Sequence, residues 1–168
     1  MPDLLAHTFI AYSVCRVLSW RFEWISSPYL TLGMVGAFIP DLVKVRLLLP
    51  GRTVEQLLGI PFAWGSLHTG GGLVVSILIG VVLLSASERR KGGVMLTVGA
   101  VSHSVADMML LTPMGRSNQQ LLWPLLQYKI PSPGLYLSTQ PEPTLVTGVV
   151  AGIVWLIHRS QMGDRPEV

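Results

Sequence analysis

Apolar residues dominate five segments of the chain, and polar or proline- and glycine-containing stretches separate them. The segments cover about residues 4–20, 29–49, 68–86, 94–111 and 143–158. Because a membrane-spanning helix needs roughly 20 apolar residues, the third and fourth segments predict spans. The first and fifth are short, which is typical of helices that are tilted, partly interfacial or packed against others. The pattern predicts an all-α integral membrane bundle of about five helices.

The longest connection, about residues 113–141, is rich in proline, glycine and polar residues. It nevertheless contains an apolar patch, Leu121 to Leu125, with Trp123 at its centre. Connections of this length more often have a function than serve only to join two elements. Trp favours a membrane–water interface. We therefore expect the patch to fold back onto the membrane surface and help to cover a functional site. No internal repeat is evident, so residues 1–168 are predicted to form a single membrane-embedded domain.

The composition agrees with a membrane protein. Of the 168 residues, 50% are hydrophobic and only 12% are charged, whereas about a quarter are charged in a typical soluble domain. The mean hydropathy is +0.54. The formal net charge of +3 is small and scattered among apolar segments, so we expect no nucleic-acid partner. The single cysteine, Cys15, excludes an internal disulfide and is typical of a buried apolar position. We predict a multi-pass protein of the inner or plasma membrane.

The basic residues predict an orientation for the bundle. Arg89, Arg90 and Lys91 form a cluster in a short connection, where the preference of Lys and Arg for the cytoplasmic side is strongest. The connection 113–141 then lies at the opposite, extracytoplasmic end. Five ionisable residues from four of the apolar segments also fall at this end: His7, Asp41, His68, His103 and Asp107.

His103 and Asp107 carry the strongest chemical signal. They lie four residues apart in an apolar helix, so both side chains leave the same face. Ionisable groups at membrane depth are costly and usually have a partner or a function. With His7, His68 and Asp41 they give three imidazoles and two carboxylates, a set that suits zinc, with manganese and iron as alternatives. We predict that these side chains hold one divalent metal ion near the extracytoplasmic end.

Each of these positions also has a structural interpretation. His103 is alternatively a satisfied core histidine, and Asp107 a partner that orients a ligand rather than a ligand itself. Asp41 follows a proline and is alternatively part of a capped helix break, while His7 is alternatively an interfacial residue. The stretch 68–72 begins with histidine and ends in three glycines. Either its backbone amides bind an anion such as phosphate at a helix N-terminus, or its glycines only permit close packing.

Several short motifs occur in an order that resembles a known family. They are the early His7, Gly36 with Phe38-Ile39-Pro40-Asp41, Leu67-His68-Thr69, Ser102-His103 with Asp107, Thr112-Pro113 with Gly115, and Leu121-Leu122-Trp123-Pro124. Over about three quarters of the chain, this order is similar to that of the YdjM-like inner-membrane metal-dependent hydrolases. The resemblance implies a helical inner-membrane protein whose His and Asp residues bind metal for hydrolysis.

Two positions depart from the family pattern. The family commonly has a second acid two residues after its Pro-Asp pair, where this chain has Val43. It also commonly has a His-Arg pair shortly before its Thr-His element, where this chain reads Phe62-Ala63-Trp64. The resemblance therefore implies that a two-metal site has lost ligands and that enough remain for one metal.

The sequence thus predicts a metal-dependent hydrolase that acts on a phosphoester or ester of a lipid or lipid-linked substrate. Asp41 and Asp107 are the catalytic candidates, because one carboxylate can act as general base in place of binding the ion. Lys44, Arg46 and Arg116 are candidates to hold a substrate phosphate.

A second function class stays open at the level of sequence. It is a non-enzymatic membrane protein in which a structural metal, or a direct His–Asp contact, clamps helices together. The departures at Val43 and Ala63 favour this alternative. The sequence carries no indication of an oligomeric state.

Overall fold

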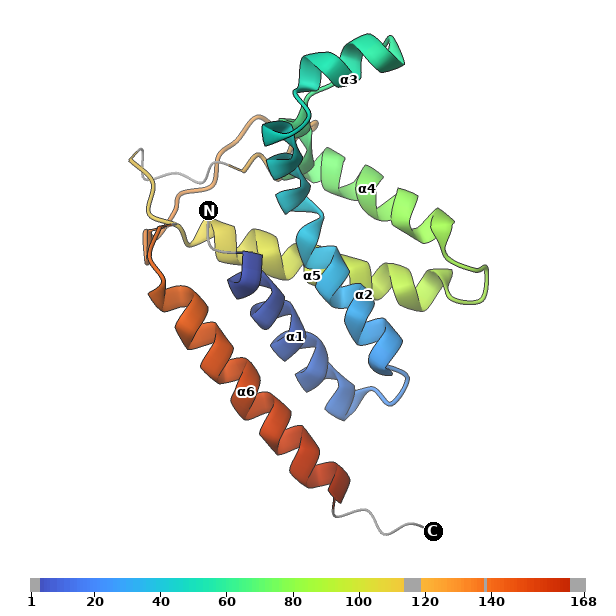
Figure 1. Cartoon of the computed structure of the whole chain (residues 1–168), viewed down its shortest axis with the longest axis vertical. Helices are drawn as coiled ribbons and strands as arrows, with labels where there is room; N and C mark the ends of the chain where they lie inside the picture. The colour runs from blue at the N-terminus through green and yellow to red at the C-terminus, as the bar shows by residue number, and fades with distance from the viewer. Residues whose placement is uncertain (1–3, 114–118, 138, 164–168) are drawn as a thin grey trace.

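The structure, a computed structural model, describes residues 4–113, 119–137 and 139–163, with the backbone alone for residues 162 and 163. Its helices are α1 (Leu4–Arg21), α2 (Ser27–Phe38), the 3-10 helix η1 (Pro40–Leu47), α3 (Gly51–Leu58), the 3-10 helix η2 (Trp64–His68), α4 (Gly70–Leu83), α5 (Arg89–Met108) and α6 (Glu142–Gly163) (Figure 1). No β-strand occurs within the described ranges, so the predicted all-α class is confirmed.

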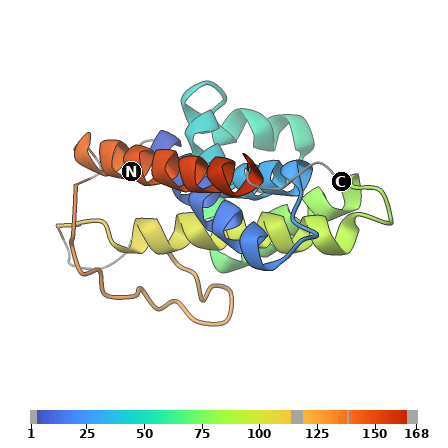
Figure 2. The same cartoon turned by 90° about the horizontal axis from the view of Figure 1, so that it is seen from below.

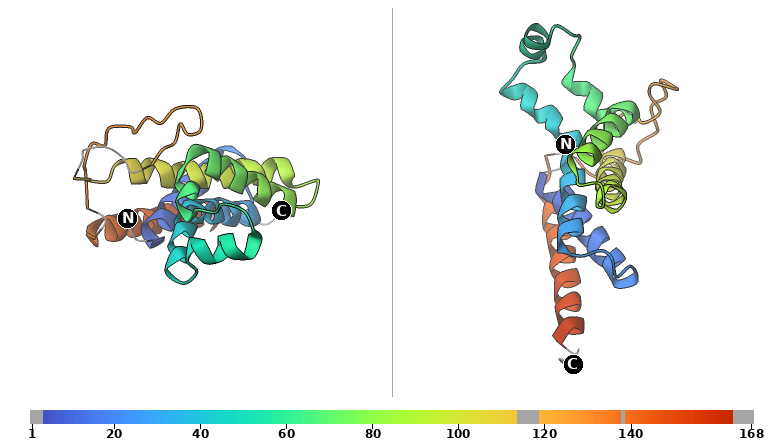
Figure 3. Two further views of the ribbon diagram at one scale, coloured as in Figure 1. Left: turned by 90° about the horizontal axis from the view of Figure 1, so that it is seen from above. Right: turned by 90° about the vertical axis from the view of Figure 1, so that its right-hand side faces the viewer.

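Helix α5 organises the arrangement, because it contacts α1, α2 and α4, while α6 packs along α1 (Figure 2). Phe9 of α1 lies against Gly148 of α6, and Arg16 Nη1 lies 3.1 Å from His158 Nε2 further along the same two helices. Helices α1 and α6 therefore run in the same direction. Helix α3 projects away from the other helices (Figure 3).

The second predicted segment does not form one continuous helix. Proline has no N–H to donate and its ring clashes with the preceding turn, so a helix usually ends before it. Helix α2 accordingly ends at Phe38, and Pro40 begins η1. At the break, the Ile39 N–H donates to the Gly36 carbonyl at 3.2 Å. The break places Asp41, which is buried, just beyond the C-terminal end of α2.

The lengths of the apolar helices also differ from expectation. The third segment, predicted as a span, forms only the 14 residues of α4. The fifth segment, predicted to be short, forms the 22 residues of α6. Within the described part of the chain, α6 alone is long and apolar enough to cross a membrane, over Glu142–Gln161. Both helices expose apolar side chains on their outer faces, among them Leu78, Val82, Leu83, Leu145, Val149 and Ile153.

Helices α2 and α5 touch through their backbones. A Cβ atom added to Gly99 of α5 would lie 1.8 Å from the Gly33 carbonyl oxygen of α2. One added to Gly36 would lie 2.2 Å from the Leu96 carbonyl oxygen. Only glycine permits this approach, which brings the C-terminal end of α2 directly against α5. Cys15 is buried beside the same contact, as the sequence predicts.

Candidate metal centre

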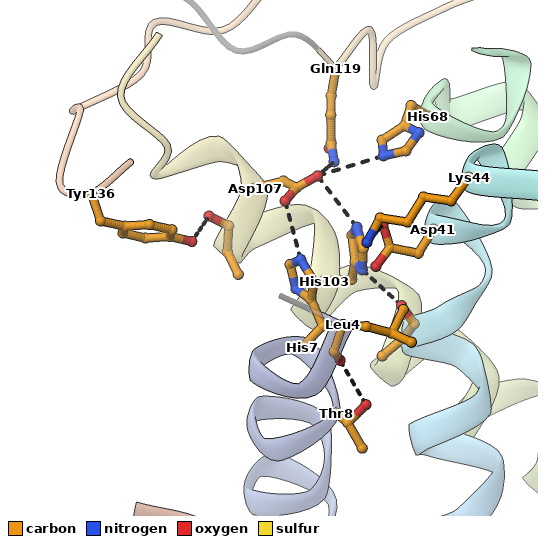
Figure 4. Close-up of polar contacts among 12 residues, drawn as sticks. Leu4, His7, Thr8, Asp41, Lys44, His68, His103, Asp107, Gln119 and Tyr136 are labelled. Carbon is orange, nitrogen blue, oxygen red and sulfur yellow. Dashed lines mark hydrogen bonds and ion pairs between the residues drawn. The ribbon is translucent and has the colours of Figure 1, made fainter. Parts of the chain in front are cut away.

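The structure brings the five predicted ligands together where α1, η1, η2 and α5 meet (Figure 4). His7 lies near the start of α1, and Asp41 in the first turn of η1. His68 is the last residue of η2, while His103 and Asp107 lie one turn apart near the C-terminal end of α5. His7, Asp41, His103 and Asp107 are all buried, and His68 is partly buried.

The Asp107 carboxylate lies at the centre of the cluster. Its Oδ1 is 3.3 Å from His7 Nε2. Its Oδ2 is 3.4 Å from His103 Nε2 and 3.6 Å from His68 Nε2. Gln119, from the connection after α5, donates from Nε2 to the same Oδ2 at 3.0 Å. One carboxylate therefore joins α1, η2, α5 and the long connection.

The His103 ring is held in one orientation by the backbone of α2. Its Nδ1 lies 2.8 Å from the Ala37 carbonyl oxygen. Because a carbonyl only accepts, Nδ1 carries a proton and donates it, which leaves Nε2 as the nitrogen that faces Asp107 and can bind an ion. Backbone carbonyls orient metal-binding histidines in this way. The Ala37 carbonyl is available because it belongs to the last turn of α2, where carbonyls have no partner within the helix.

Two imidazole rings lie against each other beside the Asp107 carboxylate. His7 stacks on His103, with ring centroids 3.7 Å apart and an angle of 19° between the planes. At this separation, positive charge on one ring disfavours positive charge on the other. Because His103 Nδ1 donates to Ala37, an Nε2 without a proton turns its lone pair toward Asp107 Oδ2, and both atoms are rich in electrons. A cation between them would stabilise both.

Hydrogen bonding supports the same requirement. Several buried atoms of the cluster have no hydrogen-bond partner among the described residues: His7 Nδ1 and Nε2, Asp41 Oδ2, His68 Nε2, His103 Nε2 and Asp107 Oδ1. Buried polar atoms are rarely left without partners, and a concentration of them needs an explanation. A divalent ion fits, because these nitrogen and oxygen atoms are the ligands that zinc, manganese and iron use.

The ligand atoms fall into two overlapping groups. His7, His103 and Asp107 have atoms within 4.8 Å of one another, and so do Asp41, His68 and His103. Both groups contain His103, whose Nδ1 is engaged by Ala37, so that only Nε2 is left to bind an ion. A single ion at Nε2 is therefore the simplest arrangement for both groups.

A cavity of about 470 Å³ opens beside the cluster and is lined by Val43, Arg46, His68, Asp107 and Gln119, among others. Of the three predicted phosphate-binding residues, Arg46 lies on its wall. Lys44 instead places Nζ 2.9 Å from Asp41 Oδ1. Arg116 lies outside the described residues. The cavity opens onto the side of the cluster formed by His68 and Asp107.

The glycine stretch after His68 does not offer an anion site, which corrects one of the two sequence interpretations. The Gly70 and Gly71 amides donate to the carbonyls of Gln120 and Trp123, at 3.2 and 2.9 Å. The Gly72 amide donates to the side chain of Thr69. A Cβ on Gly70 would lie 1.9 Å from the Leu121 carbonyl oxygen, so glycine permits close packing of the connection rather than of another helix.

The connection after α5 folds back onto the protein at Gln119 and Leu121, whereas Leu125 is 88% exposed. Contact of the patch Leu121 to Leu125 with a membrane surface stays a prediction. Leu121 packs against a buried cluster that includes Leu73 and Ala100, and Gln119 reaches Asp107. Tyr136, later in the connection, donates from its hydroxyl to the Ala106 carbonyl at 2.6 Å. Burial and the nearby Asp107 carboxylate raise the pKa of Tyr136 to about 12, so it remains a donor at neutral pH.

Sequence reasoning missed Gln119 and the Ala37 carbonyl. Gln119 carries no local signal, since it is one polar residue in a polar connection. The Ala37 carbonyl had an indirect signal, because Pro40 ends α2 and leaves the last carbonyls of the helix free.

The chain belongs to the YdjM inner membrane protein family, whose model matches residues 1–164. The resemblance seen in the sequence motifs is therefore confirmed. No curated protein and no solved structure matches the chain. Membership of the family makes this an inner-membrane protein, in agreement with the predicted location and with the span-length helix α6.

The orientation of the bundle is testable by labelling. In a Cys15→Ser background, we expect a maleimide that cannot cross membranes to label Gln127→Cys from outside, and Arg90→Cys only after the membrane is opened. Both positions are exposed, and the cationic cluster around Arg90 favours the cytoplasm. Labelling of position 90 in intact cells, with none at 127, would reverse the orientation.

Proposed function

We propose that this member of the YdjM inner membrane protein family is a metal-dependent hydrolase that cleaves a phosphoester or ester of a lipid or lipid-linked substrate. The observation that carries the proposal is the buried set of nitrogen and oxygen atoms around Asp107 and His103, which open onto a cavity. Zinc is the proposed ion, with manganese and iron as alternatives. A bound ion of this kind lowers the pKa of a water ligand to about 7 and polarises a phosphoryl or carbonyl oxygen.

The side chains around the ion would bind it, orient its ligands and bind the substrate. His7, His68 and His103 would bind the ion together with Asp41 and Asp107, and the Ala37 carbonyl would keep His103 in the binding tautomer. Gln119 would hold Asp107 Oδ2 and so fix the rotation of that carboxylate. Arg46, on the cavity wall, would pair with the anionic group of the substrate.

One carboxylate could serve as general base, and Asp107 is better placed because it lines the cavity, whereas Asp41 faces Lys44. Lys44 would then neutralise Asp41 and keep a buried carboxylate in place.

The test is hydrolysis by purified protein in phosphatidylglycerol nanodiscs, loaded in turn with zinc, manganese or iron. Release of phosphate from phosphatidic acid, of glycerol phosphate from phosphatidylglycerol, and of fatty acid from either lipid covers both bond types. We expect turnover with at least one ion and a loss of about a thousandfold in His103→Ala, since metal assistance contributes several kcal/mol. His158→Ala, a histidine far along α1 and α6 from the cluster, is the matched control and should keep its activity.

A second candidate function is favoured by the direct contacts of Asp107. The same carboxylate joins three imidazoles from three elements, as a clamp between helices would. Protein that binds one ion tightly, with every coordination position filled by side chains and no turnover of any of these lipids, would establish the clamp and exclude the hydrolase.

A further inference from the structure

A second cavity, of about 630 Å³, lies on the other side of the two 3-10 helices. Its walls are mostly apolar and include Leu42, Val54, Phe62, Trp64, Leu67 and Trp123. The only polar atom of the Trp64 side chain already has a hydrogen-bond partner, because its Nε1–H donates to the Leu49 carbonyl at 2.8 Å. The indole ring, which also packs edge to face with Phe62, therefore presents an apolar surface.

Neighbouring residues of the two 3-10 helices line different cavities. In η1, Leu42 lines the apolar cavity, whereas the next residue, Val43, lines the cavity beside the metal cluster. In η2, Leu67 lines the apolar cavity and the next residue, His68, lines the polar one. The helices η1 and η2 contact each other. The two cavities are therefore adjacent along η1 and η2, as the binding regions for the charged end and the hydrocarbon end of one molecule would be.

The apolar cavity is continuous with the outer face of α4. Val75 and Ile79 line it, and they also belong to an apolar surface strip with Leu78, Val82 and Leu83. These five side chains are between 56% and 81% exposed, which on an inner-membrane protein is typical of contact with lipid. Hydrocarbon could pass from the bilayer into the cavity along α4 without crossing water.

We infer that the apolar cavity holds an acyl chain of a membrane lipid whose anionic headgroup lies in the cavity of Arg46, His68 and Asp107. The position of the headgroup in this inference rests on the proposed function. The inference adds that the hydrocarbon chain of the lipid determines which substrate binds. A volume of this size lies within the range of ligand-binding pockets. Arg46 supplies the positive charge for the headgroup end, and the apolar walls supply the surface for the chain.

Two adjacent valines of α4 give a matched pair of variants. Val74 and Val75 are both 56% exposed, but only Val75 lines the cavity. Val75→Trp would fill the entrance, whereas Val74→Trp adds the same bulk outside it. The probe is phosphatidic acid with a diazirine at the end of one acyl chain, carried in phosphatidylglycerol vesicles, and the readout is the site of photolabelling.

We expect labelling of residues that line the cavity, about a tenfold loss in Val75→Trp, and wild-type labelling in Val74→Trp, since a filled apolar pocket costs one to two orders of magnitude. In active protein, Val75→Trp should lower kcat/KM for long-chain but not for dibutyryl phosphatidic acid. Equal labelling in both variants, or labelling confined to α6, would overturn the inference. So would adducts between two copies of the chain from a benzoylphenylalanine at position 67, because a second copy would then cover the cavity.

The labelling also separates this inference from the proposed function. Cavity labelling that persists in His103→Ala without turnover in the wild type would support the acyl-chain site and contradict the hydrolase. Turnover with no cavity labelling would support the hydrolase and contradict the acyl-chain site.

Discussion

Purified wild-type protein is expected to carry about one divalent ion per chain, and His103→Ala and Asp107→Ala should each lose most of it. The reason is geometric: the two residues lie on one face of α5, and Asp107 Oδ2 is 3.4 Å from His103 Nε2. His7 and His68 approach the same carboxylate from other elements. Removal of a side chain that only orients a ligand typically costs 10–100-fold in affinity, so loss of either ligand should cost more than about a hundredfold.

The measurement is elemental analysis after gentle purification, followed by competition with a chelator of known affinity. Gln119→Ala removes a donor to Asp107 without removing a ligand, and should fall in the 10–100-fold range. Cys15→Ala, buried in α1 away from the cluster, should retain the ion. Wild-type protein that arrives without metal and cannot be loaded with zinc, manganese or iron would leave the direct His–Asp clamp in place of the metal centre.

The gathering of the five side chains could be predicted because it depends on topology. When successive apolar segments run in opposite directions, the start of one helix lies on the same side of the protein as the end of the helix before or after it. His103 and Asp107 were predictable for a second reason, since a spacing of four residues fixes them on one face of any helix.

The lengths of the helices were harder to predict, because they depend on where each helix is capped. Thr69 caps α4 by accepting from the Gly72 amide, so the helix begins two residues after His68. Pro40 divides the second segment, although its apolar pattern continues across the break. Hydrophobicity reports burial in protein or lipid, and it does not report the backbone hydrogen bonds that end a helix.

Contacts made by backbone atoms cannot be predicted from the pattern of side chains along the sequence. The Ala37 carbonyl selects the tautomer of His103, yet no side chain at position 37 signals it. The amides of Gly70 and Gly71 illustrate the reverse case, in which a stretch typical of an anion site is filled by the protein's own carbonyls. Both depend on the path of segments that are distant in the sequence.

Gly99→Ala is expected to disrupt the packing of α2 on α5, although alanine favours helices more than glycine does. The added Cβ would lie 1.8 Å from the Gly33 carbonyl oxygen and 2.8 Å from the Ala37 nitrogen, so the two helices must separate. Overpacking of this kind typically costs 1–3 kcal/mol and more where backbone must move. We expect the free energy of unfolding to fall by about 3 kcal/mol or more, measured by pulse proteolysis in detergent.

Gly152→Ala in α6 is the matched control, because a Cβ there meets nothing within 4 Å. It should leave stability unchanged or raise it by up to about 1 kcal/mol through helix propensity. The same separation of α2 from α5 would draw the Ala37 carbonyl away from His103, so Gly99→Ala should also bind the metal less tightly, and Gly152→Ala should not. Equal stability of the two variants would mean that α2 and α5 are further apart than the structure has them, and the tautomer argument for His103 would fail with that contact.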